Sequence, residues 1–162
     1  MVIGSGGDTG IDGIAIIVNG SIVSDVESLE EHADLSGNFD VTFVFVQAER
    51  TPSFDASKIG NFGFGVRDFF ESKPRLVRNQ KVEELAEVMA TLYAQGTKFK
   101  PDNPACRLYY VTTGNWIGDA NLEARRNAVM EDLRSMQIFR DVDFECVGAS
   151  GFSNFTDSQR TL

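Results

Sequence analysis

The sequence has few of the residues from which common metal and catalytic sites are made. Its 162 residues include only two cysteines, Cys106 and Cys146, too few for a zinc knuckle or a disulfide framework. Each cysteine lies in or beside an apolar strand-like run, so we expect each to be a small buried thiol. The single histidine, His32, stands in an acidic stretch. One histidine excludes His-rich metal sites and disfavours a histidine-based catalytic triad.

Long apolar segments are also missing. No apolar run reaches the roughly 20 residues of a membrane-spanning helix, and the start shows no secretory signal. Hydrophobic residues make up 42% of the chain and charged residues 24%, which is ordinary for a globular protein. We therefore expect a soluble cytoplasmic protein without membrane contact, in which residues 1–162 form a single domain. Because both termini are abrupt, we also expect this domain to be a fragment of a longer protein.

The sequence has fewer basic than acidic residues. Fifteen lysines and arginines stand against 24 acidic residues, which gives a formal net charge of −9. An acidic surface repels phosphate backbones and so counts against tight unaided binding of nucleic acid. A local basic patch remains open, and the segment 73–81 holds four cations, Lys73, Arg75, Arg78 and Lys81. This segment either contacts phosphates or, more commonly for such a run, is a solvated loop that balances nearby acids.

The glycine-rich stretch at residues 4–10 does not match a nucleotide-binding loop. Position 9 is threonine where the last glycine of G-x-G-x-x-G would fall, and a strand rather than a helix follows. No Gly-Lys-Ser/Thr occurs anywhere, which excludes a P-loop. A nucleotide-binding α/β domain is therefore discounted.

Strand-like and helix-like segments alternate along the chain. We expect strands at 14–18, 21–23, 41–50, 107–113 and 142–147, and helices within 25–38, 54–72, 82–95 and 121–136. Ser53 is a plausible cap for the helix that follows it, and glycines within that helix predict a bend or break. Asn19-Gly20 predicts a type I′ hairpin between the first two strands. The alternation predicts an α/β sheet with helices on both faces and an antiparallel hairpin at its edge.

The strand expected at 41–50 ends in polar residues. Its nearly continuous apolar run is typical of a central strand. Because side chains alternate between faces, Gln47 and Glu49 share one face, while Arg50 points to the other. If the hairpin pairs antiparallel beside this strand, Asp12 comes close to Gln47 and Glu49. The two carboxylates then form a candidate cation site, although an ordinary polar strand end explains the same pattern.

These motifs resemble those of known families. Gly-Gly-Asp-Thr-Gly-Ile-Asp-Gly, a strand hairpin and Phe-Val-Gln-Ala-Glu-Arg follow one another in the layout of the PD-(D/E)XK nuclease superfamily, most closely its Mrr-like branch with G-I-D-G and a later Q-x-K. Further stretches are similar to the N-terminal region of the AIPR family, which is associated with abortive phage infection. These stretches are Gln47-Ala48-Glu49-Arg50, Ser53-Phe54-Asp55, Val77-Arg78-Asn79 and Leu108-Tyr109-Tyr110-Val111-Thr112-Thr113-Gly114. The resemblance covers most of the chain.

The resemblance implies a three-layer αβα restriction-endonuclease-like fold and metal-dependent cleavage of nucleic acid, with DNA as the expected substrate. Asp12 matches the metal-binding aspartate and Gln47 the Gln or Glu of the second half-motif. Ala48 would offer its backbone carbonyl to the metal. Hard oxygen ligands suit Mg²⁺, and Mn²⁺ is the expected substitute.

Position 49 departs from the family pattern, which has lysine where this chain has Glu49. Some superfamily members are active with glutamate there, where it can ligate metal or act as a base. The expected catalytic residues are thus Asp12, Gln47 and Glu49, and the expected metal ligands are Asp12, Ala48 and Glu49. Asp8 is a weaker candidate, since a turn explains it equally well.

Two functions remain open from the sequence. The first is a metal-dependent nuclease domain in phage defence. The second is a catalytically inactive sensor or interaction module on the same fold, which the glutamate and the acidic charge favour. The sequence also leaves open whether the protein forms a homo-oligomer.

Overall fold

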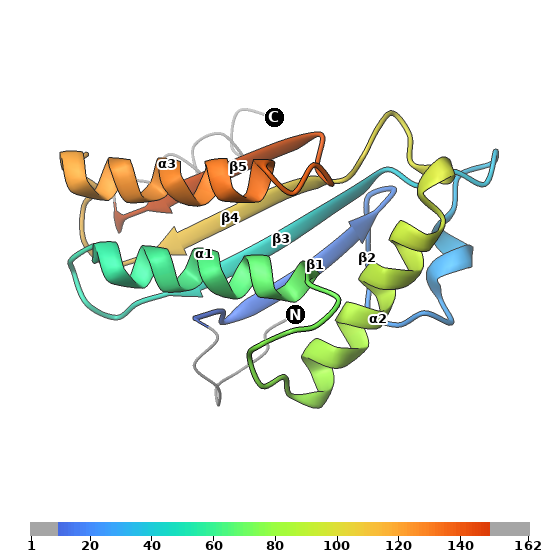
Figure 1. The fold of residues 1–162 in the computed structure, drawn as a ribbon, viewed down its shortest axis with the longest axis horizontal. Coiled ribbons are helices and arrows are strands. Elements are labelled where there is room, and N and C mark those ends of the chain that lie inside the picture. Colours follow the sequence, from blue (N-terminus) through green and yellow to red (C-terminus); the bar gives the residue numbers. More distant parts are fainter. Residues whose placement is uncertain (1–9, 150–162) are drawn as a thin grey trace.

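The computed structural model describes residues 10–149, whose centre is a five-stranded mixed sheet (Figure 1). Its strands are β1 (Gly13–Val18), β2 (Ser21–Val23), β3 (Val41–Ala48), β4 (Ala105–Val111) and β5 (Asp141–Val147). They lie in the order β2-β1-β3-β4-β5. β1 is antiparallel to β2 and β3, whereas β3, β4 and β5 are mutually parallel. The predicted α/β class, the central position of β3 and the antiparallel hairpin are confirmed.

The turn between β1 and β2 has the predicted geometry. Asn19 and Gly20 have φ angles of 50° and 84°, and a type I′ turn needs positive φ at both positions. The Asn19 side chain also holds the segment before β3, because its amide donates to the carbonyls of His32 and Asn38. The helix expected within 25–38 is wrong in extent. Only a short 3₁₀ helix, η1 (Leu29–His32), forms there.

Three longer helices complete the fold, α1 (Ala56–Phe70), α2 (Gln80–Ala94) and α3 (Ala120–Arg134), with a 3₁₀ turn, η2 (Gly96–Lys98), after α2. The cap predicted for α1, Ser53, is wrong. α1 begins two residues later than that cap requires, because the Asp55 carboxylate accepts hydrogen bonds from the backbone N–H groups of Ser57 and Lys58. Within residues 10–149 no helix combines the length and apolarity that crossing a membrane requires.

The bend predicted at the glycines of α1 is also wrong, since the helix is continuous. Gly63 lies against α3, where an added Cβ would stand 2.5 Å from the Val129 Cγ2 atom. The missing side chain therefore lets two helices approach closely, and their contact offsets the low helix propensity of glycine.

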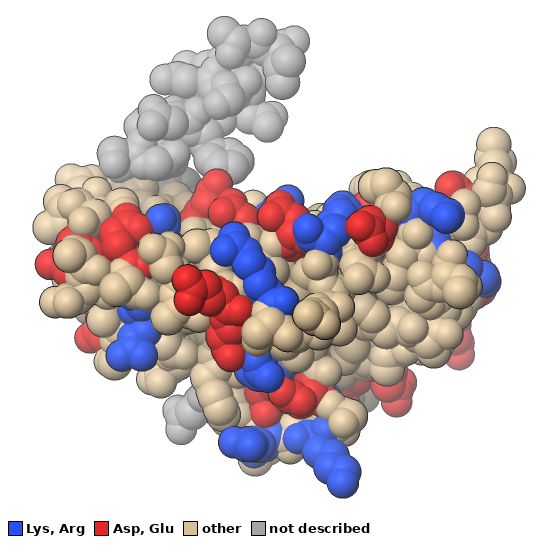
Figure 2. Space-filling view, turned by 45° about the horizontal axis from the view of Figure 1, so that its top comes forward, with Lys and Arg blue, Asp and Glu red and all other residues tan. Residues whose placement is uncertain are grey.

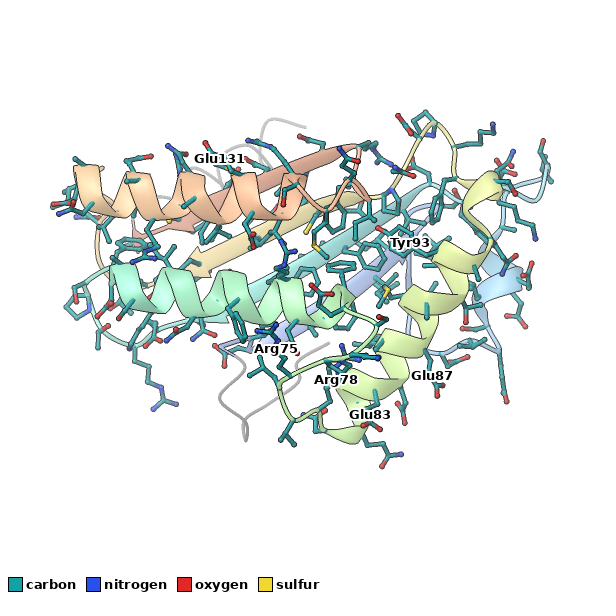
Figure 3. All side chains as sticks on the ribbon, in the orientation of Figure 1. Arg75, Arg78, Glu83, Glu87, Tyr93 and Glu131 are labelled. Atoms are coloured by element: carbon teal, nitrogen blue, oxygen red, sulfur yellow. The ribbon has the colours of Figure 1, made fainter. Side chains whose placement is uncertain are left out.

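The three helices lie against one face of the sheet (Figure 1). Phe45 of β3 meets Phe69 of α1 at 5.5 Å between ring centroids, and Phe62 of α1 meets Phe144 of β5 at 5.7 Å. Tyr93 of α2 reaches the same face, as the side-chain view shows (Figure 3). Apart from the buried Ala105 at the start of β4, the other face carries half-buried and exposed side chains. The mixed sheet and its helices are consistent with a three-layer αβα fold. Within residues 10–149 the predicted helices on both faces are found on one face only (Figure 1).

Both cysteines are free thiols. Cys106 in β4 is completely buried, as predicted, and Cys146 in β5 is partly buried. Burial raises the pKa of Cys146 to about 12, so the thiol stays protonated at ordinary pH. Neither cysteine is therefore suited to nucleophilic chemistry in this environment.

Candidate functional site

The start of β1 meets the end of β3 at the edge where the parallel strands end. Gly13 pairs with Val46 in the antiparallel register, which places Asp12 beside Gln47. The Asp12 backbone N–H donates to the Val46 carbonyl at 2.8 Å, and the Asp12 carboxylate accepts from the Ala48 N–H at 2.7 Å. The predicted meeting of Asp12 with the end of β3 is confirmed, while the metal-binding role of Asp12 stays a prediction.

The Asp12 carboxylate has a structural role at this position. It takes the place of a backbone carbonyl opposite the last residue of β3 and so closes the ladder between β1 and β3. Only its Oδ2 atom is used, and Oδ1 has no hydrogen-bond partner among residues 10–149. One oxygen is therefore available for a ligand without disturbing the strand pair.

Glu49 is held by two neighbours. The Gln47 side-chain amide donates to Oε1 at 3.2 Å, as expected for two residues on the same strand face. The ammonium of Lys58, on the first turn of α1, donates to Oε2 at 2.8 Å. The Glu49 side chain is only 17% exposed, so this ion pair is partly shielded from water. The hydrogen bond to Glu49 raises the pKa of Lys58 above its ordinary value.

Lys58 is the residue that the sequence analysis missed. It follows Glu49 by nine positions and stands on a different element, so no strand periodicity links them. The Asp55 cap was the available signal, because a helix that starts there puts Lys58 on its first turn, close to the preceding strand end. Lys58 brings to the end of β3 the positive charge that the strand lacks at position 49.

The wall beside this cluster is apolar. Tyr110 of β4 pairs with Gln47 in register and is fully buried. Its hydroxyl has no hydrogen-bond partner among the residues that the structure describes. Burial raises the pKa of Tyr110 to about 12, and the Glu49 carboxylate adds to the effect. Phe54 packs on Tyr110 at 5.6 Å and on Trp116 at 4.9 Å between ring centroids, so aromatic rings form this wall.

Arg50, which the sequence analysis placed on the opposite strand face, plays no part in the cluster as the structure describes it. Arg50 is exposed, and its carbonyl accepts a hydrogen bond from the Thr113 hydroxyl. Its side chain makes no ion pair with Asp12 or Glu49 within residues 10–149, which agrees with its expected position on the opposite face. Asp8 lies outside the described residues.

Asp12 could serve as a ligand of a divalent metal ion, whereas Glu49 could do so only in part. Among residues 10–149, no three or more His, Cys, Asp or Glu side chains gather as a metal site. Mg²⁺ accepts as few as one or two carboxylates, because it keeps several waters and takes further oxygens from substrate phosphates. Asp12 meets this requirement with its available oxygen. Glu49 is committed to Lys58 and joins a ligand set only after that ion pair opens.

No protein-family model, curated protein or solved structure matches this chain. Assignment to the PD-(D/E)XK superfamily or the AIPR family therefore remains an expectation from the motifs.

Proposed function

We propose that the chain is a metal-dependent nuclease domain that hydrolyses phosphodiester bonds of nucleic acid, with DNA as the expected substrate. The observation that carries the proposal is the Asp12 carboxylate, 2.7 Å from the Ala48 N–H, at the strand end that also bears the Glu49–Lys58 pair. A role in phage defence rests on the motif resemblance alone.

Each residue has a distinct role in this proposal. Asp12, with the Ala48 carbonyl, holds Mg²⁺ or Mn²⁺, which when bound stabilises charge on phosphoryl oxygens and lowers the pKa of a bound water. Lys58 offsets phosphate charge rather than accepting a proton, because a lysine ammonium keeps its proton at neutral pH. When Lys58 turns from Glu49 to the phosphate, the freed Glu49 carboxylate can accept a proton from the attacking water. Gln47 orients Glu49 through its amide.

A second candidate function is a catalytically inactive sensor or interaction module. The observation that favours it is the occupied state of Glu49, whose two oxygens are bonded to Gln47 and Lys58. A carboxylate that is neutralised in this way stabilises the strand end without any metal.

The test combines calorimetric titration of Mn²⁺ with cleavage of plasmid DNA. Asp12→Asn keeps an oxygen that can accept from Ala48 but loses the charge, so we expect loss of the Mn²⁺ heat and of cleavage. Lys58→Met should reduce cleavage about 100-fold or more, whereas Lys100→Met, at an exposed lysine, should leave it unchanged. Wild-type protein that gives neither Mn²⁺ heat nor cleavage of DNA or RNA would rule out the nuclease and leave the inactive module.

A further inference from the structure

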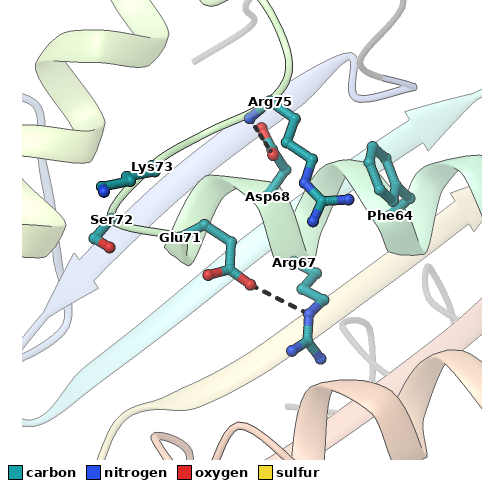
Figure 4. Close-up of a pocket in the computed structure, with 7 residues that line it drawn as sticks. All are labelled: Phe64, Arg67, Asp68, Glu71, Ser72, Lys73 and Arg75. Carbon is teal, nitrogen blue, oxygen red and sulfur yellow. Dashed lines mark hydrogen bonds and ion pairs between the residues drawn. The ribbon is translucent and has the colours of Figure 1, made fainter.

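A cavity of about 500 Å³ lies at the other end of α1, away from the candidate active site (Figure 4). Its walls include Phe64, Arg67 and Asp68 of α1 and Lys73 and Arg75 of the segment that follows. Cavities of this size accept small molecules. We propose that it binds a nucleotide, with the base on Phe64 and the phosphate at Arg75, whose guanidinium extends toward that ring, while Lys73 adds positive charge farther along the cavity wall (Figure 4).

A buried carboxylate fixes the basic segment in place. Asp68 is only 5% exposed, and its carboxylate accepts hydrogen bonds from the backbone N–H groups of Arg75 at 2.7 Å and Leu76 at 3.2 Å. The segment is thereby held over the end of α1 before any ligand arrives. A site ordered in advance loses less conformational entropy on binding.

Arg78 covers the end of the helix. Its guanidinium donates to the carbonyls of Asp68 and Phe69 at 2.9 and 3.0 Å and lies 5.8 Å from the centre of the Phe69 ring. The carbonyls at a helix C-terminus carry partial negative charge and repel anions. Arg78 offsets that charge, so an anion can approach the neighbouring cations. Arg75 and Arg78 both extend from the segment between α1 and α2 (Figure 3).

The cavity holds cations that no acid of the described residues neutralises. Arg67 is compensated by Glu71 at 3.3 Å and by Asp132 at 2.8 Å. Lys73 and Arg75 are exposed and have no ion-pair partner among residues 10–149. In a chain of net charge −9, two uncompensated cations at one cavity mark a local preference for an anion. An arginine guanidinium such as that of Arg75 binds phosphate through paired hydrogen bonds.

Phe64 adds an aromatic surface to these cations. The side chain is 47% exposed and forms part of the cavity wall, unlike the buried Phe62 and Phe69 of the same helix. A single exposed apolar residue is ordinary on a protein surface. An exposed ring beside the unpaired guanidinium of Arg75 is the arrangement on which nucleic-acid bases stack (Figure 4). The shared chemistry is a nucleotide, either free or within a single strand.

The test measures binding by anisotropy, in EDTA to prevent cleavage, with a fluorescent six-nucleotide thymidine oligomer. Unlabelled thymidine monophosphate and inorganic phosphate serve as competitors. Phe64→Ala and Phe64→Leu should each weaken binding about 5- to 100-fold. Lys73→Gln with Arg75→Gln should weaken it as well, and the slope of log affinity against log salt should fall by about 0.7 for each phosphate that is no longer neutralised. Matched controls are Leu35→Ala and the pair Lys100→Gln with Arg125→Gln, all at exposed positions.

Oligomer binding that the monophosphate displaces at similar concentration identifies a free-nucleotide site, and displacement by oligomer alone identifies a single-strand site. Both outcomes support the proposal. Absence of binding, wild-type affinity in both Phe64 variants, equal loss in the control pair, or displacement by phosphate as effective as by monophosphate would each overturn it. Asp12→Asn should bind normally here, which separates this result from failure of the nuclease proposal.

Discussion

The two ends of α1 carry similar residues in opposite arrangements. At the start, Asp55 is an exposed cap, and Lys58 is neutralised by Glu49 at 2.8 Å. At the end, the carboxylate of Asp68 is buried. The nearby cations Lys73 and Arg75 have no acidic partner in the described part of the chain. Lysines and arginines are interspersed with acids over the face in Figure 2. Local pairing, rather than net charge, therefore decides where an anion can bind.

The buried carboxylate at the end of α1 should have the largest effect on stability. Asp68→Ala leaves the backbone N–H groups of Arg75 and Leu76 without their acceptor. Unsatisfied groups of this kind destabilise by about 1–3 kcal/mol each, so we expect urea unfolding to show a loss of about 2–4 kcal/mol. Asp68→Asn retains one acceptor and should lose less. A loss below about 1 kcal/mol in Asp68→Ala would show that the basic segment is not held by this carboxylate.

The middle of α1 joins the two ends and offers a matched pair of glycines. A Cβ added at Gly63 meets Val129 at 2.5 Å, so Gly63→Ala should destabilise the protein by about 1–3 kcal/mol. A Cβ at Gly60 meets only the flexible side chain of Arg125 at 3.4 Å. Gly60→Ala should therefore stabilise by about 0.5–1 kcal/mol through helix propensity. Thermal melts should show a lower Tm for Gly63→Ala and a higher Tm for Gly60→Ala. Adding Val129→Ala to Gly63→Ala should restore part of the lost stability.

The sequence predicts the sheet better than it predicts the helices. β-rich apolar runs and the Asn19-Gly20 turn are local signals, and the strands follow them. The continuity of α1 depends on its contact with Val129, which no local propensity contains. The apolar run of β3 indicated helices on both faces, but β5 alternates between exposed Asp143 and buried Phe144, which is the pattern of a sheet with one covered face.

The candidate active site likewise combines one residue that the sequence could place and one that it could not. The sequence placed Asp12 beside the end of β3 only on the condition that the hairpin pairs antiparallel next to that strand, and the condition is met because β1, rather than β2, is the neighbour of β3. Lys58 could not be placed, because its approach to Glu49 depends on the path of the loop between β3 and α1. The cavity at the end of α1 depends on the buried position of Asp68, and a charged residue within a helix gives no sequence signal of burial.

The cap at the start of α1 should have a moderate effect. Asp55→Ala removes the acceptor for the N–H groups of Ser57 and Lys58, and we expect the Tm to fall by about 3 °C. The hydrogen bond from the Ser57 hydroxyl, with those from the two N–H groups, lowers the pKa of Asp55 below its usual 3.8.

A lowered pKa in the folded state means that the stabilisation is present above pH 3.8 and is lost as pH falls through the folded value. The difference in Tm between wild type and Asp55→Ala should thus be constant from neutral pH down to about 5 and should shrink below pH 3.8. Asp55→Asn is the control, because its amide oxygen caps the helix without titrating. A difference that grows on acidification would contradict the capping role.

The smallest effects concern one tyrosine beneath each end of α1, and they should have opposite signs. Tyr110 packs against Phe54 at the start, and its buried hydroxyl has no partner within residues 10–149, so Tyr110→Phe should be neutral or stabilise by up to about 1 kcal/mol. Tyr93 packs against Phe70 at the end and donates to the Ile138 carbonyl at 2.9 Å, so Tyr93→Phe should destabilise by about 1 kcal/mol. Urea unfolding of both variants measures the contrast. A stability loss in Tyr110→Phe as large as that in Tyr93→Phe would mean that the Tyr110 hydroxyl is hydrogen-bonded in solution, and the wall beside Glu49 would then be polar rather than dry.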